Sequence, residues 1–227
     1  MALSTETGWS GFGAGQVRIA WAETSPGGSD TDLPGAHLSD QDLARAAGFG
    51  PDRRRAFLQG RSLIAGLVRD LFPDASGWSL GTRTCRRCGA RHAGVEITGV
   101  PAAASVSYAL GLVVAAAARG PRVSRLGIDV ERDAVNAPRS RDLQRLLGPS
   151  TVSPLRRWTR IESVVKADGR GLRADPADVH FRAGYGRVSG DPAWYRVTDV
   201  AGPAGYLISL AWCGAESSAA GSRPATV

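Results

Sequence analysis

Two stretches of the chain are long and regular enough to form long helices, and they limit the fold more than any other feature. In residues 52–72, apolar side chains from Phe57 to Leu71 recur every three or four positions, and Pro73 follows. The second stretch, residues 153–168, begins with a serine N-cap and a proline and is followed by Gly169. Because short strand-like runs flank both stretches, we expect an α+β fold.

The strand-like runs fall in the same order around each helix. Apolar residues alternate in residues 16–22, 126–131, 179–182, 195–200 and 206–211, and turn residues separate these runs. Residues 105–118 are predicted to form a hairpin that turns at Gly111, although residues 112–118 also suit a helix. A short helix is expected to begin after Ser39.

This order divides the chain into four parts. We expect a flexible N-terminus over residues 1–15, one half over residues 16–122, a second half over residues 123–214, and a flexible tail over residues 215–227. Each half should be a small sheet packed on a long helix, and the two halves should be related by pseudo-twofold symmetry. The repeat is one of layout, because the residues themselves do not repeat.

The chain is basic, and nearly all of its positive charge comes from arginine. The chain has 227 residues, 28 Lys plus Arg against 21 Asp plus Glu, and a net charge of +7, yet Lys166 is its only lysine. Such a charge suits anionic partners such as nucleic acid, phosphorylated cofactors or acidic proteins. The arginines of the first long helix, Arg53, Arg54, Arg55, Arg61 and Arg69, are expected on a solvated face.

The chain is expected to reside in the cytoplasm. No apolar run approaches the roughly 18 to 20 residues of a membrane span, and the first residues do not resemble a secretory signal. Cys85, Cys88 and Cys213 are too few for a disulfide framework, which favours a reducing compartment.

Two acidic residues alternate with apolar ones in Gly127-Ile-Asp-Val-Glu131. On a strand, Asp129 and Glu131 project from the same face, and a carboxylate pair of this kind can share Mg²⁺. The alternative is an exposed strand end with ordinary surface charge.

The second long helix carries a core stripe with a charged pair beside it. Trp158, Ile161 and Val165 fall on one face, and Glu162 and Lys166 are four residues apart on its flank. Taken alone, that pair is typical of a surface ion pair worth about 0.3 kcal/mol.

Together the two motifs, G-x-D-x-E and W-x-x-x-E-x-x-x-K, resemble the signature of 4′-phosphopantetheinyl transferases of the longer, monomeric type. The resemblance extends over about residues 16–213. It includes a basic helix at residues 54–69, a Cys/Gly/His segment at residues 85–92, a serine-containing hairpin at residues 105–107 and a closing strand at residues 205–211.

The resemblance implies a transferase that moves 4′-phosphopantetheine from coenzyme A to a serine of an apo acyl or peptidyl carrier protein. Mg²⁺, or alternatively Mn²⁺, would be held by Asp129, Glu131 and Glu162. Lys166 would contact the phosphates, and Glu162, or a water held by Glu131, would take the serine proton. Neither nucleic acid nor a membrane is expected as a partner, and the protein should be a monomer. The residues implied for coenzyme A are Arg54, Arg61, Arg91, His92, Ser107, Tyr108, Asp129 and Lys166.

Three positions depart from the family pattern. Tyr108 stands where a histidine is usual, Ile161 where a lysine is frequent, and Gly94-Val95 where a basic residue and proline are usual. These losses favour a second hypothesis, in which the fold binds carrier proteins but no longer catalyses transfer. The Cys85/Cys88 pair with His92 also allows a structural zinc site, for which Cys213 or a distant histidine would be the fourth ligand. The other histidines, His37 and His180, are expected to have surface or packing roles.

Overall fold

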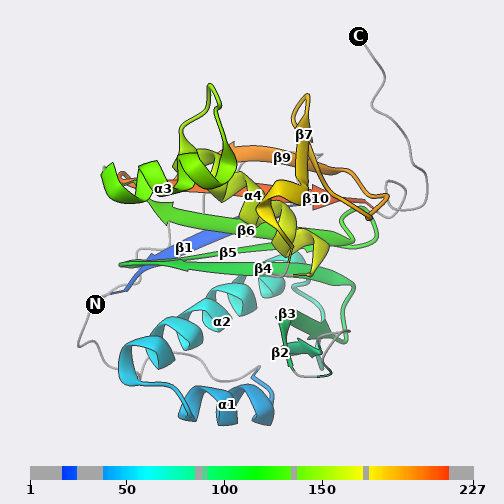
Figure 1. Ribbon diagram of the computed structural model, residues 1–227. Coiled ribbons are helices and arrows are strands. Elements are labelled where there is room, and N and C mark those ends of the chain that lie inside the picture. The colour runs from blue at the N-terminus through cyan, green and yellow to red at the C-terminus, as the bar shows by residue number, and fades with distance from the viewer. Residues whose placement is uncertain are drawn as a thin grey trace.

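The computed structural model describes residues 17–24, 38–84, 89, 91–133, 137–170 and 174–214. In this part of the chain the fold is α+β, with two larger antiparallel sheets between two pairs of helices (Figure 1). The strands are β1 (Val17–Glu23), β2 (Ser79–Thr84), β3 (Arg91–Thr98), β4 (Ala102–Ala109), β5 (Leu112–Arg119), β6 (Arg125–Arg132), β7 (Val179–Arg182), β8 (Tyr185–Val188), β9 (Tyr195–Val200) and β10 (Tyr206–Cys213). The helices are α1 (Asp40–Ala47), α2 (Pro51–Leu71), α3 (Ala137–Leu147), α4 (Pro154–Asp168) and a short 3₁₀ turn, η2 (Pro176–Asp178).

The first sheet has the order β1-β5-β4, and α2 covers one of its faces. The central strand β5 is buried from Leu112 to Ala118 because it is covered on both sides. Val113, Ala115 and Ala117 pack against α2, while the alternate residues pack toward the second sheet. The predicted hairpin is therefore confirmed, and Gly111 makes its turn with a φ of 85°.

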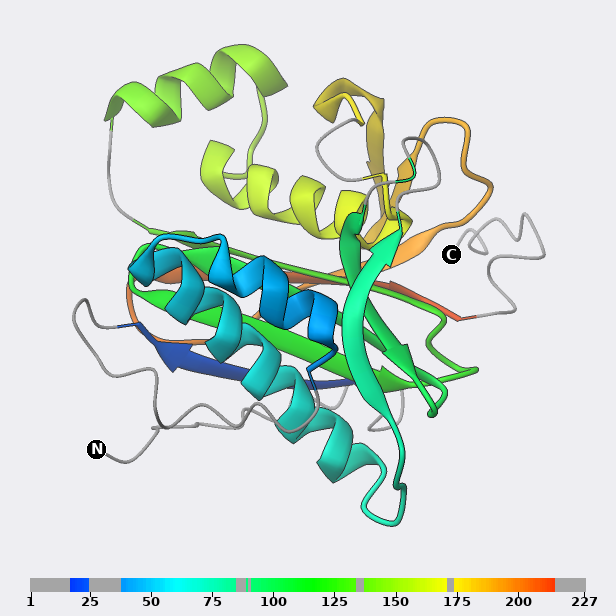
Figure 2. The ribbon, with the colours of Figure 1, turned by 90° about the horizontal axis from the view of Figure 1, so that it is seen from below.

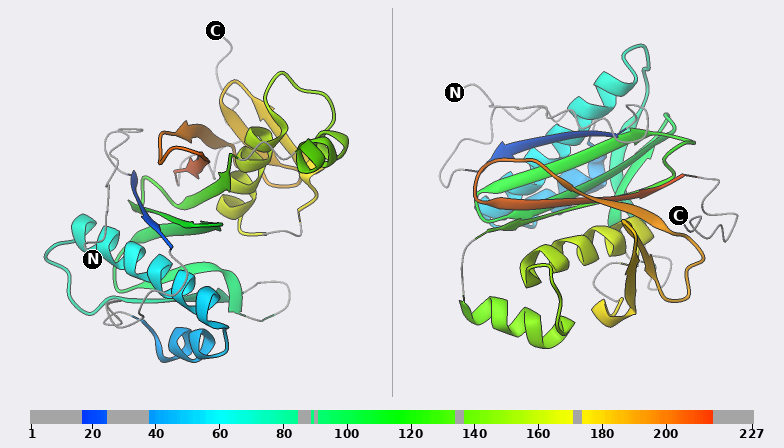
Figure 3. Two further views of the ribbon diagram at one scale, coloured as in Figure 1. Left: turned by 90° about the vertical axis from the view of Figure 1, so that its left-hand side faces the viewer. Right: turned by 90° about the horizontal axis from the view of Figure 1, so that it is seen from above.

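The second sheet has the order β6-β10-β9-β8-β7, and α4 lies on its outer face. Its inner face, with Ile128, Ile208 and Leu210, packs on the first sheet in a shared apolar core. The layers are thus helix, sheet, sheet and helix. Figure 3 shows α2 and α4 on opposite sides of the two sheets.

A separate two-stranded ribbon, β2-β3, stands beside α1 and α2 (Figure 2). Ser39 caps α1, as predicted, because its hydroxyl accepts a hydrogen bond from the Asp42 N–H at 3.2 Å. Leu38, the residue before this cap, forms a β-bridge with Leu80 of β2, and the Ser39 N–H donates to the Leu80 carbonyl oxygen at 3.0 Å. These contacts fix α1 against β2.

The long helices begin and end close to the predicted residues. Helix α2 ends at Leu71, two residues before Pro73. Helix α4 has Ser153 as its N-cap and ends at Asp168, and the Gly169 that follows has a φ of 87°, the left-handed conformation expected of a glycine that caps a helix. The expectation of a wholly solvated arginine face on α2 is wrong for Arg61, which is only 3% exposed. Helix α3 and strands β2, β3 and β8 were not predicted.

Side chains bridge the edges of the two sheets where β4 lies against β6. The Ser105 hydroxyl accepts a hydrogen bond from the Ile128 N–H at 3.1 Å, and the Ser107 hydroxyl donates one to Asp129 Oδ1 at 2.9 Å. Ser105 and Ser107 lie on the same face of β4 because they are two residues apart. We call this line of contact the β4–β6 seam.

Candidate active site at the β4–β6 seam

The candidate site forms where α4 crosses β6 at unusually short range. Gly127 makes this approach possible, because a Cβ on it would lie 2.0 Å from the Ser163 carbonyl oxygen and 2.4 Å from the Ala167 nitrogen. A side chain there would collide with the helix backbone. The glycine of the G-x-D-x-E motif is thus required by packing. Because Asp129 is two residues further along the same strand face, this packing also brings Asp129 close to α4.

Asp129, Ser107 and Lys166 form a closed triangle of polar contacts. The Lys166 ammonium donates to Asp129 Oδ1 at 2.7 Å and to the Ser107 hydroxyl at 2.7 Å, while Ser107 donates to the same carboxylate oxygen. The Asp129 side chain is 7% exposed and that of Lys166 is 27% exposed. The chain's only lysine is therefore a partly buried member of this cluster, and its partner is an aspartate of the other motif.

Glu131 lies at the outer end of the same strand face. Its carboxylate accepts a hydrogen bond from Arg139 of α3 at 2.6 Å. Burial raises the pKa of Glu131, and the negative charge of Asp129 adds to this, while Arg139 and a hydrogen bond from Trp158 act in the opposite direction. Trp158 is only half-buried, so the prediction of a fully buried core stripe holds for Ile161 and Val165 and is wrong for the tryptophan.

Glu162 is electrostatically linked to both acidic residues of β6. Burial raises the pKa of Glu162, the charges of Asp129 and Glu131 raise it further, and Lys166 lowers it. The three predicted metal ligands are therefore near enough to repel one another. Lys166 and Arg139 supply the opposing positive charge.

The donor chemistry of these residues fits a hard divalent cation. Oδ2 of Asp129 is buried and has no hydrogen-bond partner in the described part of the chain, so one carboxylate oxygen is left for a ligand. The described ranges do not, however, hold three or more His, Cys, Asp or Glu side chains arranged as a ready metal site. A cation at this place would take over the role of Lys166 and Arg139 as the counter-charge of the carboxylates.

A second group of predicted residues lies on the other face of β4, near α2. Tyr108, which follows Ser107, points the opposite way, toward Gly60, where an added Cβ would lie 2.7 Å from the tyrosine hydroxyl. Burial of that hydroxyl raises the pKa of Tyr108 to about 12 although the residue as a whole is 43% exposed. The nearby charges of Arg61 and Arg45 lower the pKa of Tyr108 and that of Asp42 raises it, but burial outweighs them, so Tyr108 stays a neutral phenol.

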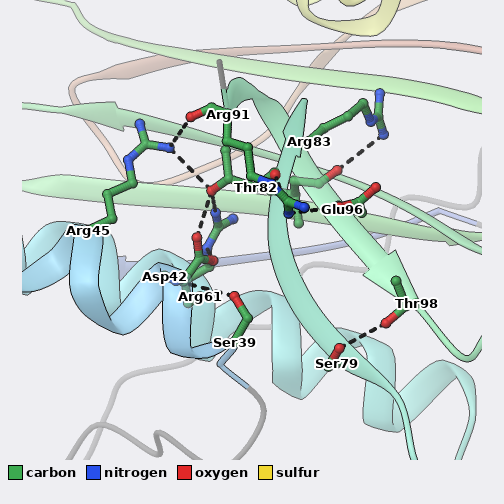
Figure 4. A network of polar contacts seen from close by, with 11 residues as sticks. Ser39, Asp42, Arg45, Arg61, Ser79, Thr82, Arg83, Arg91, Glu96 and Thr98 are labelled. Atoms are coloured by element: carbon green, nitrogen blue, oxygen red, sulfur yellow. Dashed lines mark hydrogen bonds and ion pairs between the residues drawn. The ribbon is translucent and has the colours of Figure 1, made fainter. Parts of the chain in front are cut away.

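Arg61 belongs to a buried network that ties α2 to α1 and β2 (Figure 4). Its Nε lies 2.8 Å from Oδ2 of Asp42, and its Nη2 donates to the Thr82 hydroxyl at 2.9 Å. Thr82 in turn donates to Oδ1 of Asp42 at 2.7 Å. Asp42 is fully buried, so the charge of Arg61 is matched within the protein.

The remaining predicted coenzyme A residues are partly described. Arg91 lies on β3 near Glu96, at 3.6 Å, and donates weakly to the Thr82 carbonyl oxygen at 3.4 Å. Arg54 lies in the first turns of α2. The described part of the chain does not include residues 37 and 85–88 or the side chain of His92, so the zinc hypothesis stays a prediction. Cys213, the fourth ligand considered for it, is buried on β10. His180 is exposed and shares a hydrogen bond with Ser189 at 3.0 Å.

Several polar residues around the site were not predicted: Asp42, Thr82, Arg139, Asp199 and Ser209. Their partners lie from 8 to 43 residues away in sequence, so no local pattern marks them.

Within the described part of the chain, no helix combines the length and the hydropathy that crossing a bilayer requires. No protein-family model matches this chain, and a search of curated proteins finds no match.

Proposed function

We propose that this protein transfers the 4′-phosphopantetheine group of coenzyme A to a serine of an apo acyl or peptidyl carrier protein, with Mg²⁺ or Mn²⁺ as cofactor, in the cytoplasm. The observation that carries the proposal is the cluster at the β4–β6 seam. There, one oxygen of Asp129 is bonded to the only lysine, the other is buried without a described partner, and two glutamates lie in electrostatic range.

Each charged residue of the cluster would have a distinct role in the transfer. Asp129, Glu131 and Glu162 would hold the metal ion, which supplies charge neutralisation at the pyrophosphate. Lys166 would bind the phosphate oxygens and stabilise the leaving group. In the transfer, the carrier serine oxygen forms a bond to the β-phosphorus, the bond between that phosphorus and the bridging oxygen breaks, and 3′,5′-ADP leaves. Glu162, or a water held by Glu131, accepts the serine proton.

Raised pKa values suit this use of the glutamates. Burial raises the pKa of Glu162, and the neighbouring carboxylates act in the same direction. A carboxylate with a higher pKa is a stronger base once it is deprotonated. The same environment favours any cation that offsets the mutual repulsion of the three acids.

We further propose that residues 16–122 and 123–214 are two halves related by pseudo-twofold symmetry in a monomer, with coenzyme A bound between them. In support, each larger sheet pairs its first strand with its last, in the orders β1-β5-β4 and β6-β10-β9. Each of these sheets also packs on one long helix. For the adenosine phosphates, Arg54, Arg91 and His92 remain the candidates.

A carrier-protein-binding module without catalysis is the second candidate. One observation favours it: Arg61, a predicted phosphate ligand, is engaged by Asp42 and Thr82. Tyr108 in place of histidine adds no positive charge, and Ile161 is buried in the core, where it makes no phosphate contact.

The test is to incubate the protein with Mg²⁺, coenzyme A and a set of apo carrier proteins, and to weigh the carriers by mass spectrometry. We expect one carrier or more to gain the mass of phosphopantetheine, and Glu162→Ala to abolish the gain while its circular dichroism spectrum is unchanged. Glu23→Ala, an exposed change on β1, is the matched control. Carrier binding without mass gain or coenzyme A binding would favour the second candidate, and no interaction with any carrier or with coenzyme A would contradict both.

A further inference from the structure

Three polar side chains form a row across the second sheet, on the face covered by α4. Ser209 of β10 lies directly opposite Asp129 of β6 on one side and opposite Asp199 of β9 on the other. Directly opposed residues of antiparallel strands project from the same face. The Ser209 hydroxyl donates to Oδ1 of Asp199 at 3.2 Å, which confirms the shared face. The row joins the candidate active site to a second acidic residue two strands away.

Helix α4 is attached to both ends of this row. Near its C-terminus, Lys166 donates to Asp129 at 2.7 Å. At its middle, Arg160 donates to Asp199 through Nε at 2.9 Å and through Nη2 at 2.8 Å, and in its first turn Arg156 donates to Asp199 Oδ2 at 2.8 Å. Burial opposes the charge of Asp199, but the hydrogen bonds from the two arginines outweigh this and hold the pKa of Asp199 below its ordinary value.

The attachment at Asp199 is directional. A guanidinium that binds both oxygens of one carboxylate is fixed in its plane as well as in its distance. All side chains of a helix turn together when the helix rotates about its own axis. A rotation of α4 that breaks the contact of Arg160 with Asp199 would therefore also turn Glu162 away from β6. The apolar packing of Ile161, Val164 and Val165 keeps the helix on the sheet, but apolar contact is non-directional and does not set the rotation as tightly.

We propose that Asp199 is a positioning residue: its clamp on Arg160 and Arg156 sets the rotation of α4, and thereby the direction in which Glu162 and Lys166 face Asp129 and Glu131. The effect on transfer rests on the proposed function. The effect on Lys166 does not, because the contact between Lys166 and Asp129 exists without any substrate.

The single lysine makes this test direct. With ¹⁵N-lysine labelling, the full-length protein gives one side-chain ammonium resonance, which belongs to Lys166. We expect Asp199→Asn to shift or broaden this resonance. We also expect it to raise the Mg²⁺ concentration for half-maximal transfer by about tenfold, because Glu162 would no longer be held in its direction toward Asp129 and Glu131. The matched control is Asp142→Asn, which removes an exposed acid paired with Arg145 on α3.

A second pair of variants separates positioning from stability. Asp199→Glu keeps a carboxylate for the guanidinium fork and should restore most of the resonance position, while Arg160→Gln removes the fork without adding a second lysine and should behave like Asp199→Asn. If Asp199→Asn fails to fold, Arg160→Gln carries the test. A Lys166 resonance and an Mg²⁺ dependence equal to those of Asp142→Asn would overturn the proposal. If wild-type protein shows no transfer but the resonance still moves in Asp199→Asn, the positioning role stands and the proposed function fails.

Discussion

At the scale of single residues, Gly127 shows how a motif can be fixed by packing. We predict that Gly127→Ala lowers the free energy of unfolding by about 3 kcal/mol or more. The added Cβ would collide with backbone atoms of α4, and relieving the collision would require the whole helix to shift. Chemical denaturation followed by fluorescence measures the change.

The control for this prediction is another glycine in a regular element. Gly66 lies within α2, and a Cβ added there meets nothing within 4 Å. Gly66→Ala should therefore stabilise the protein by up to about 1 kcal/mol, since alanine has the higher helix propensity. Equal effects at Gly66 and Gly127 would contradict the close approach of α4 to β6.

Lys166 is the second residue whose identity matters beyond its charge. We predict that Lys166→Arg reduces transfer at least about tenfold, because the longer and planar guanidinium does not match the position in which the compact ammonium donates to both Ser107 and Asp129 at 2.7 Å. Steady-state kinetics measures the loss. Wild-type kcat in this variant would show that charge alone suffices.

At the scale of elements, α1, α2 and β2 depend on one buried ion pair. We predict that Asp42→Ala lowers the free energy of unfolding by about 3–5 kcal/mol, because it leaves the Arg61 charge buried without its partner. The surface pair of Asp52 and Arg55 provides the comparison, and Asp52→Ala should cost about 1 kcal/mol or less. Similar losses in the two variants would contradict the internal role of Arg61.

The clamp on α4 has a pH dependence of defined sign. Burial raises the pKa of Asp199, but Arg160 and Arg156 outweigh it and lower the pKa below its ordinary value. A depressed native pKa gives stability that is fully present above the unfolded pKa of about 3.9 and is lost as the pH falls through the native pKa. The difference in unfolding free energy between wild type and Asp199→Asn should hold from pH 7 to pH 5 and shrink below about pH 4. Urea unfolding across this range is the measurement, and a difference that shrinks between pH 7 and pH 5 would contradict the assignment.

Elements with strong local patterns could be predicted, and those without could not. Helices α2 and α4 carry apolar stripes and terminal signals, and β5 is a continuous apolar run. Helix α3 has just three apolar leucines among charged residues, of which Leu146 is 56% exposed, so its periodicity is weak. Strand β8 is four residues long and contains Gly186, so its own alternation is too short to stand out, although it pairs with the neighbouring strand β7 through the turn at Ala183 and Gly184.

At the scale of the whole molecule, the two sheets share an apolar core but meet edge to edge through hydroxyls. We predict that Ser105→Ala costs about 1–3 kcal/mol of unfolding free energy, because the buried Ile128 N–H loses its acceptor across the β4–β6 seam. Ser79→Ala, which breaks an exposed hydroxyl pair with Thr98, should change stability by about 0.5 kcal/mol or less. Thermal and chemical denaturation measure both, and equal costs would contradict the importance of the seam.

The candidate site itself could be predicted in composition but not in arrangement. The spacing of Asp129 and Glu131 on one strand, and of Glu162 and Lys166 on one helix, follows from local periodicity. That Lys166 hydrogen-bonds to Asp129, that Arg139 pairs with Glu131, and that Ser107 rather than Tyr108 faces Asp129 all depend on how α3, α4 and β4 pack on β6. Those contacts join residues far apart in sequence, and no local pattern contains them.

The scarcity of lysine has a consequence for chemical modification. Arginine side chains do not react under the mild conditions in which amines are acylated or reductively alkylated, so the chain offers such reagents one side-chain target besides its terminal amine. That target is tied to Asp129 and Ser107 and is 27% exposed. The yield of labelling at position 166 therefore reports how often this contact opens, and a ligand that covers Lys166 should be detected as protection of one amine.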